Sequence, residues 1–178
     1  MMKAVMLSIR PEWCDLIIQG KKTVELRKTR PKLQTPFKVY IWCTKAGKFW
    51  ARIHGNGWQQ LDERIIGEFV CNDISLLTHI GEMGSNNPPE LCSVSSSYMP
   101  RSPEALLKAA CLYSSAAENY LKGRDGYCWH ISDLKIYDEP IKLKNFRVKR
   151  PDRNGDGLRD VCNPPQSWIY LEEPEVQK

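Results

Sequence analysis

The stretch GKKTVELR, residues 20–27, decides the fold assignment. It begins with a glycine that can end a helix and continues as a strand that carries charged residues. It is bounded by Gly20 and rich in β-formers, so it predicts a short strand. Side chains alternate between the two faces of a strand, which puts Glu25 and Arg27 on one face and Lys22 on the other. A carboxylate and a guanidinium therefore lie on one face, about 7 Å apart along the strand, which is twice the rise per residue.

The overall composition is that of a globular chain of ordinary size. The 178 residues are 42% hydrophobic and 26% charged, which suits one domain with a core of its own. The formal net charge of +5 permits contact with phosphate but lies below the balance typical of a dedicated nucleic-acid binder. Apolar runs stay well short of the roughly 18 residues that a membrane helix requires, and the first residues lack the features of a signal peptide. These features predict a cytoplasmic protein without a membrane partner.

The cysteines are spread singly along the chain, with no C-x-x-C pair and an odd total. Structural zinc sites usually need ligands paired at short spacing, so we expect no metal in folding and no other cofactor. Free and mostly buried thiols in a reducing compartment fit this spacing. The seven cysteines are Cys14, Cys43, Cys71, Cys92, Cys111, Cys128 and Cys162.

The hydrophobic pattern predicts about six strands and a few helices. Strands are expected at residues 4–9, 20–27, 37–43, 65–71, 127–131 continued by 134–137, and 167–171. A first helix starts near Pro11 and stops at Gly20, and later helices are expected at residues 103–112 and 114–121. Loop insertions are expected near residues 45–62, 81–102 and 150–165. Because the helices do not alternate regularly with the strands, the pattern favours an α+β fold with a small mixed β-barrel over a doubly wound sheet.

Four stretches resemble, in this order, the ASCH domain, a family with the PUA-like β-barrel fold. They are LSIRPEWCDLIIQGKKTVELRK, IIGEFVC, YCWHISDLKIYDEPIKL and PPQSWIYLEE. The most specific piece is the pattern G-x-K-T-x-E-x-R, matched here by Gly20, Lys22, Thr23, Glu25 and Arg27. The resemblance implies a PUA-like mixed β-barrel of about six strands with peripheral helices, as a single domain over residues 1–178.

The resemblance also implies a role that involves RNA or its components. The family is associated with RNA-related binding, some small members are amidohydrolases that act on N4-acetylcytidine, and ribonuclease activity has been attributed to others. In the amidohydrolase type the motif supplies a lysine, then a threonine nucleophile at the position that Glu25 holds here, and a glutamate just ahead of the later helix completes the set. This sequence keeps the lysine as Lys22, but the corresponding stretch LKAACLYSS contains no acid. A glutamate cannot replace a hydroxyl nucleophile that a nearby base activates.

We therefore expect a charged cleft that binds RNA, a nucleotide or a modified nucleoside. In this fold the motif strand lines the cleft, where Glu25 accepts and Arg27 donates hydrogen bonds to a base edge. Lys22 or Lys21 would meet a phosphate. The alternative function is a hydrolase acting on a modified nucleoside or on RNA, with Lys22 and Glu25 as its catalytic candidates. The plainer alternative for the charged residues is an exposed strand face whose ion pairs are solvated and weak.

Two further polar residues are candidates for the same cleft. Ser8, at the end of the first strand, offers a hydroxyl, and His130 is a polar liner beside Trp129, for which packing is the better interpretation. In the free protein each charge of the motif should already be paired, with the other or with a neighbour such as His130. A third option for function is a protein-interaction domain that uses the loop at residues 81–102.

A pattern near the end of the chain is similar in part to a calcium-binding loop. Asp152, Asn154, Asp156, Gly157 and Asp160 occupy positions 1, 3, 5, 6 and 9 of that pattern. Asn163 stands at position 12, where a bidentate glutamate is expected, and the prolines that follow exclude an exiting helix. A hydrophilic turn of Asn, Gly and Asp is the simpler interpretation.

Overall fold

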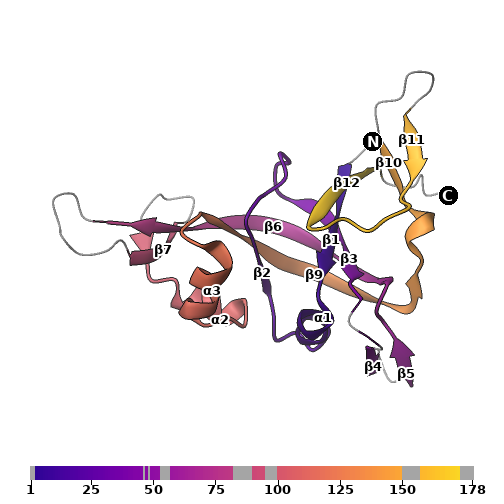
Figure 1. Ribbon diagram of the computed structural model, residues 1–178, viewed down its shortest axis with the longest axis horizontal. Coiled ribbons are helices and arrows are strands. Elements are labelled where there is room, and N and C mark those ends of the chain that lie inside the picture. The colour runs from indigo at the N-terminus through magenta and orange to yellow at the C-terminus, as the bar shows by residue number, and fades with distance from the viewer. Residues whose placement is uncertain are drawn as a thin grey trace.

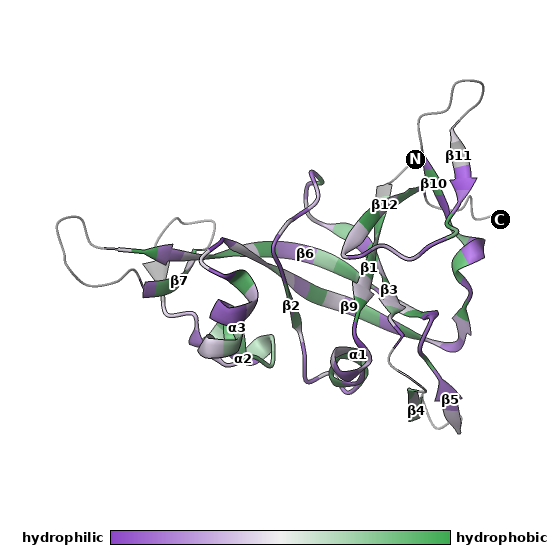
Figure 2. Cartoon of the chain, viewed as in Figure 1, coloured by the Kyte–Doolittle hydropathy of each residue, from purple (hydrophilic) through white to green (hydrophobic). Residues whose placement is uncertain are grey.

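The computed structural model describes residues 3–45, 47, 49–52, 57–81, 90–94, 100–149 and 157–172. Two long strands, β6 (Arg64–Ile80) and β9 (Gly126–Ile141), pair antiparallel and run side by side through the molecule (Figure 1). Their register shifts at three places, so both strands bend as they pair. Figure 2 shows hydrophobic and hydrophilic residues interspersed along both strands, as expected where each face has a different environment.

The other strands extend this pair on both sides. The described sheet has ten strands, ordered β11-β10-β12-β1-β3-β6-β7-β8, with β9 paired to β6 and β2 paired to β9. Their bounds are β1 (Lys3–Ile9), β2 (Val24–Arg27), β3 (Phe37–Cys43), β7 (Glu90–Val94), β8 (Pro100–Arg101), β10 (Arg147–Lys149), β11 (Leu158–Asp160) and β12 (Trp168–Glu172). Strands β1 and β3 are parallel, and the other pairs are antiparallel.

The α+β class is as predicted, but the closed barrel of about six strands is wrong. The sheet has ten strands, and within the described residues no backbone ladder joins β2 to β1. A side chain spans that opening instead, because Arg27 Nη2 on β2 donates to the carbonyl oxygen of Ser8 on β1. The strands β6 and β9 also continue past the curved part of the sheet and pair there with β2 and β7.

In the part of the chain that the structure describes, three α-helices pack against this sheet. Helix α1 (Pro11–Ile18) has proline at its first turn and is followed by Gly20 at φ 68°, which confirms both predicted boundaries. Helices α2 (Glu104–Ala109) and α3 (Ser114–Leu121) lie near the residues predicted for them, and a short 3-10 helix, η1 (Leu143–Asn145), precedes β10. Figure 1 shows α2 and α3 together below the part of β6 and β9 that reaches toward β7.

Two of the expected loop insertions contain sheet strands. Residues 81–102 hold β7 and β8, and residues 150–165 hold β11. The insertion at residues 45–62 forms a separate antiparallel hairpin of β4 (Trp50–Arg52) and β5 (Trp58–Gln60). The two predicted strand segments at residues 127–137 form one continuous strand, β9.

The hydrophobic core divides at the strand β2. Val24 and Leu26 face a cluster that α2 and α3 cover, together with Leu107 and Leu121. Trp129, opposite Glu25, belongs to the larger cluster inside the curved sheet. Glu25 therefore points into the protein interior. No helix in the described residues is long and apolar enough to cross a bilayer.

Candidate functional site

The turn between α1 and β2 positions Lys22. Backbone N–H groups of Lys21 and Lys22 both donate to the carbonyl oxygen of Leu16, at 2.9 and 3.0 Å, which holds this turn against the end of α1. Strand β2 begins only at Val24, so Lys22 precedes the regular alternation of the strand. Its side chain consequently reaches the same interior as Glu25, although simple alternation would separate them.

Lys22, Glu25 and Arg27 form a buried triad of charges with the carboxylate in the middle. Lys22 Nζ lies 3.2 Å from Glu25 Oε2, and Arg27 Nη2 lies 3.0 Å from Glu25 Oε1. The exposed fractions of the three side chains are 2%, 8% and 11%. The predicted pairing of Glu25 with Arg27 is present, and the alternative of a solvated charged strand face is wrong.

Lys22 has two further partners that hold its ammonium group in place. Its Nζ donates to the carbonyl oxygen of Ala110 at 2.7 Å, and the same nitrogen lies 4.9 Å from the centroid of the Trp13 ring. Ala110 ends α2, where helix carbonyls lack intrahelical partners and attract positive charge. The triad is thus tied to two helices as well as to β2.

Ser8 contributes its backbone to the triad and uses its hydroxyl elsewhere. Arg27 Nη2 donates to the carbonyl oxygen of Ser8, as noted for the opening between β1 and β2. The Ser8 hydroxyl donates to the carbonyl oxygen of Pro165 at 2.6 Å. The hydroxyl that the sequence suggested for the site is therefore occupied by a main-chain contact in the free protein.

Two buried N–H groups on this face of the sheet have no acceptor in the described part of the chain: Arg27 Nε and Trp129 Nε1. Trp129 pairs with Glu25 across β2 and β9, so its ring lies on the triad's face of the ladder. It is fully buried, with ring centroids 5.7 Å from Phe37 and 6.2 Å from Trp168. A buried donor without a partner costs about 1–3 kcal/mol, so both groups favour a bound acceptor.

His130 and Lys21 lie away from the triad. His130 pairs with Val24, which puts it on the opposite face of the β2–β9 ladder, and its Nε2 lies 2.8 Å from Ser75 Oγ. The expectation that His130 pairs with Glu25 or Arg27 is wrong, because adjacent strand residues face opposite sides. Lys21 is exposed, and its carbonyl oxygen accepts a hydrogen bond from the Cys111 thiol at 3.4 Å.

Sequence reasoning missed Ala110 and Trp13 as partners of Lys22. Every residue type has a backbone carbonyl, so the identity of residue 110 as alanine gives no indication of this contact. Trp13 lies on the helix just before the motif, and its contact depends on the turn at Gly20.

Buried thiols near the triad are held neutral. Burial raises the pKa of the Cys14 thiol well above its ordinary value, and Cys43 and Glu25 add to this. Burial also raises the pKa of Cys128 to about 12, although nearby Lys22 lowers it. Because the thiolate is the reactive form, these cysteines are poor nucleophiles at neutral pH.

The calcium-loop pattern falls largely outside the described residues. Asp152, Asn154 and Asp156 are not among them, whereas Asp160 lies in β11 with its Oδ1 at 3.6 Å from Arg147 Nε. Calcium binding there remains a prediction. In the described ranges, no three His, Cys, Asp or Glu residues are grouped so that they could hold a metal ion.

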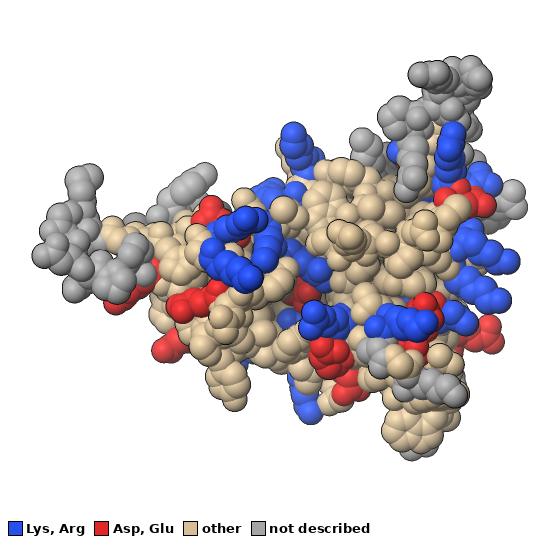
Figure 3. Space-filling model, in the orientation of Figure 1, with Lys and Arg blue, Asp and Glu red and all other residues tan. Residues whose placement is uncertain are grey.

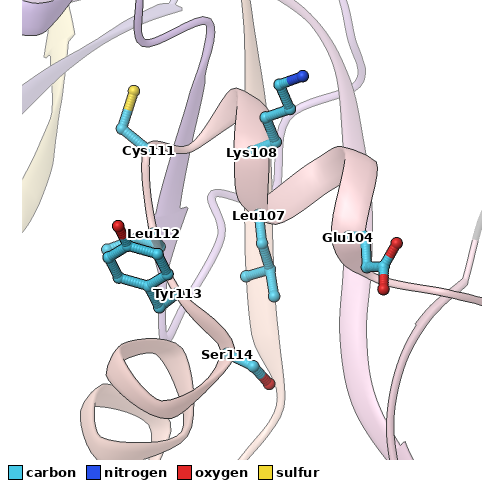
Figure 4. Close-up of a pocket in the computed structure, with 7 residues that line it drawn as sticks. All are labelled: Glu104, Leu107, Lys108, Cys111, Leu112, Tyr113 and Ser114. Atoms are coloured by element: carbon cyan, nitrogen blue, oxygen red, sulfur yellow. The ribbon is translucent and has the colours of Figure 1, made fainter.

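Two pockets lie outside the triad. One, of about 470 Å³, lies at the junction of α2 and α3, where Figure 4 shows Glu104, Lys108, Cys111, Tyr113 and Ser114 around Leu107. The other, of about 340 Å³, lies on the far face of β2 and contains His130. Neither pocket is lined by Glu25 or Arg27.

Comparison with known proteins identifies similarities in sequence and fold. The model of a family described as ASCH domain matches residues 7–122. The crystal structure of ASCH from Zymomonas mobilis is similar with a TM-score of 0.57 and 19% identity, over 96% of this chain and 88% of that one. A tyrosine-to-phenylalanine variant and a serine-to-alanine variant of that protein give TM-scores of 0.54 and 0.56 at 20% and 19% identity, over 96% of this chain and 91% and 89% of theirs. No curated protein matches the chain. Because the identities are only 19–20%, the similarity to these solved structures supports the fold alone.

Proposed function

Because the chain belongs to the ASCH domain family, we propose that it binds RNA, or a nucleotide or modified nucleoside, at the triad of Lys22, Glu25 and Arg27. The family supports an RNA-binding or hydrolase-like role in general. Of these two roles, the geometry of the triad favours binding.

The observation that carries the proposal is the surplus of hydrogen-bond donors beside the triad. Its two cations and one carboxylate leave a formal charge of +1, and Glu25 already accepts from both cations. Arg27 Nε and Trp129 Nε1 remain without an acceptor among the described residues. The carbonyl oxygens and ring nitrogens of a base, or the oxygens of a phosphate, are acceptors that would satisfy these donors.

Aromatic residues adjoin the more exposed end of the triad. Thr29 lies two residues after Arg27, and its Oγ1 accepts a hydrogen bond from Trp168 Nε1 at 2.9 Å. Trp168 and the partly exposed Tyr170 pack edge to face, with ring centroids 5.2 Å apart. Such rings on β12 can stack a base whose edge reaches Arg27.

Long-range electrostatics has a smaller part in the proposal. The net charge is only +5, and the face in Figure 3 carries basic and acidic side chains interspersed. Binding should therefore depend on local hydrogen bonds more than on release of counterions, and should weaken only modestly with salt.

The hydrolase alternative has less support from the site. Lys22 Nζ is engaged by both Ala110 and Glu25, and burial keeps the nearby thiols of Cys14 and Cys128 protonated. A general base needs a free lone pair and a reachable nucleophile. The triad is accordingly better suited to holding a ligand than to cleaving one.

A ligand screen by thermal denaturation tests the proposal. Free nucleosides, acylated cytidines, nucleotides and short RNA oligomers are each added in excess, and a specific ligand at 100 times its Kd should raise Tm by roughly 5–10 °C. Arg27→Lys keeps the charge but removes Nε and the planar fork, so it should abolish the shift while the protein still folds. Arg124→Lys, at an exposed arginine, is the matched control and should respond like the parent.

Three results would count against the proposal. One is the absence of a shift with every probe, and another is an equal shift in the Arg27→Lys variant. The third is release of free acid from N4-acetylcytidine, measured by chromatography, that persists in Ser75→Ala and is lost in Arg27→Lys; it would reassign the triad to the hydrolase alternative.

A further inference from the structure

The pocket on the far face of β2 contains a serine and a histidine in hydrogen-bond contact. Ser75 of β6 and His130 of β9 line this pocket of about 340 Å³, and Ser75 Oγ lies 2.8 Å from His130 Nε2. Both side chains are half-buried. Val24 lines the same pocket, whereas Glu25 faces the other side of the ladder, so this site is separate from the triad.

The bent pairing of β6 and β9 brings the two residues together. Their register shifts between Cys71 and Ile74, after which Ser75 pairs with Cys128. Cys128 and His130 are two positions apart on β9, so Ser75 and His130 are diagonal neighbours on one face. The backbone N–H of Ile131 donates to the carbonyl oxygen of Thr23 at 2.9 Å, which ties β9 to the turn before β2.

The rest of the pocket lining is small and uncharged, apart from the His130 ring. Hydroxyl side chains are contributed by Thr23, Ser93 and Ser102, and apolar groups come from Val94 and from Leu106 of α2. Such a lining suits a small neutral ligand with a carbonyl group that can accept a hydrogen bond.

We propose that Ser75 and His130 are the nucleophile and the general base of a second site, which cleaves small uncharged esters. A serine hydroxyl becomes nucleophilic when an adjacent base takes its proton, and the 2.8 Å contact meets this requirement. In the tautomer with its proton on Nδ1, His130 accepts a hydrogen bond from the Ser75 hydroxyl at Nε2. Thr23 lines the pocket and can donate to the carbonyl oxygen as it becomes negative.

The reaction would proceed in two steps. Ser75 Oγ attacks the ester carbonyl carbon while its proton passes to His130 Nε2, and the alcohol leaves with that proton as the acyl–Ser75 bond forms. A water molecule then gives a proton to Nε2 and attacks the acyl group. The carboxylic acid departs, and the proton returns from His130 to Ser75.

Covalent labelling of the full chain tests this site directly. A fluorophosphonate probe should lose fluoride and form a phosphorus–oxygen bond to Ser75, which peptide mass spectrometry identifies on the unmodified sequence. Hydrolysis of 4-nitrophenyl acetate should exceed the buffer rate, and Ser75→Ala and His130→Gln should each lower this excess at least tenfold. His130→Gln should also lose the label.

Ser132→Ala is the matched control, because Ser132 lies on β9 but its hydroxyl donates to the carbonyl oxygen of Val70 at 2.9 Å. It should keep both the label and the hydrolysis. Absence of a label on Ser75, or hydrolysis by Ser75→Ala at the parental rate, would overturn the proposal. Mapping of the label uses the parent protein, so the test stands even if a variant fails to fold.

Discussion

Glu25 is the residue on which the triad depends. It pairs with Lys22 and Arg27, and all three side chains are nearly closed to solvent. Buried ion pairs add little net stability when they form, but removal of one partner leaves an uncompensated charge in the interior. Lys22 and Glu25 therefore contribute differently, since Arg27 still balances Glu25 if Lys22 is lost.

We expect Glu25→Gln to lower the free energy of unfolding by about 3–5 kcal/mol, because two buried cations lose their counter-ion. Lys22→Met should lower the free energy of unfolding less, by about 1–3 kcal/mol. It leaves Glu25 and Arg27 as an ion pair with no net charge, and it leaves the carbonyl oxygen of Ala110 without the Lys22 donor. Urea denaturation measures both values. Glu118→Gln on the exposed face of α3 is the control and should change little. The reverse order for Glu25 and Lys22 would contradict this account of the triad.

At the scale of elements, the pairing of β6 with β9 shapes both candidate sites. The bulge at Cys71–Ile74 joins Ser75 to His130, and the straight pairing of β9 with β2 sets Trp129 opposite Glu25. Gly67 lies at another irregularity of the same pair. A Cβ at Gly67 would lie 2.4 Å from the carbonyl oxygen of Lys135, which is backbone and cannot move aside alone.

Gly67→Ala should therefore destabilise the protein by roughly 3 kcal/mol or more, because β6 and β9 must separate to accept the methyl group. Gly126→Ala on β9 is a matched comparison. The nearest atoms to a Cβ there would be the ends of the Leu26 and Leu121 side chains, at 2.8 and 3.0 Å, which can rotate away. Thermal melts should show a clearly smaller loss for Gly126→Ala. Equal losses would mean that the approach of the two backbones at Gly67 is not the limiting contact.

At the scale of the whole molecule, buried thiols and a buried tyrosine hydroxyl make the free energy of unfolding depend on pH in the alkaline range. Burial raises the pKa of Cys71 and of Cys128 to about 12 from an ordinary value of 9.0. Burial and the hydrogen bond to Glu68 also raise the pKa of the Tyr137 hydroxyl. In each case the folded protein holds a proton that the unfolded chain releases more readily.

The sign of the effect follows from this difference. The stabilising contribution is complete below about pH 9, where the unfolded thiols are still protonated, and declines as the pH rises toward about 12. Urea denaturation at pH 8 to 10.5 should show a falling free energy of unfolding. Cys128→Ala should reduce the slope, whereas Cys162→Ala, at an exposed cysteine, should not. A slope that Cys128→Ala leaves unchanged would contradict the assignment.

Much of the local structure could be predicted from sequence. The pattern at residues 37–43 corresponds to β3, that at residues 114–121 to α3, and Pro11 and Gly20 mark the ends of α1. Period-two alternation also placed Glu25 with Arg27. These features depend on neighbouring residues and on backbone dihedral preferences, which the chain carries locally.

The tertiary structure alone decided how distant segments meet. The turn after α1 directs Lys22 to Glu25, the carbonyl oxygens of Ala110 and Ser8 complete the partners of the two cations, and a bulge joins Ser75 to His130. The pairing order of the described strands, which leaves β1 and β2 without a ladder between them, is likewise a tertiary feature. Strand register, bulges and main-chain acceptors arise from pairing over long sequence separations, and residue types along one segment do not encode them.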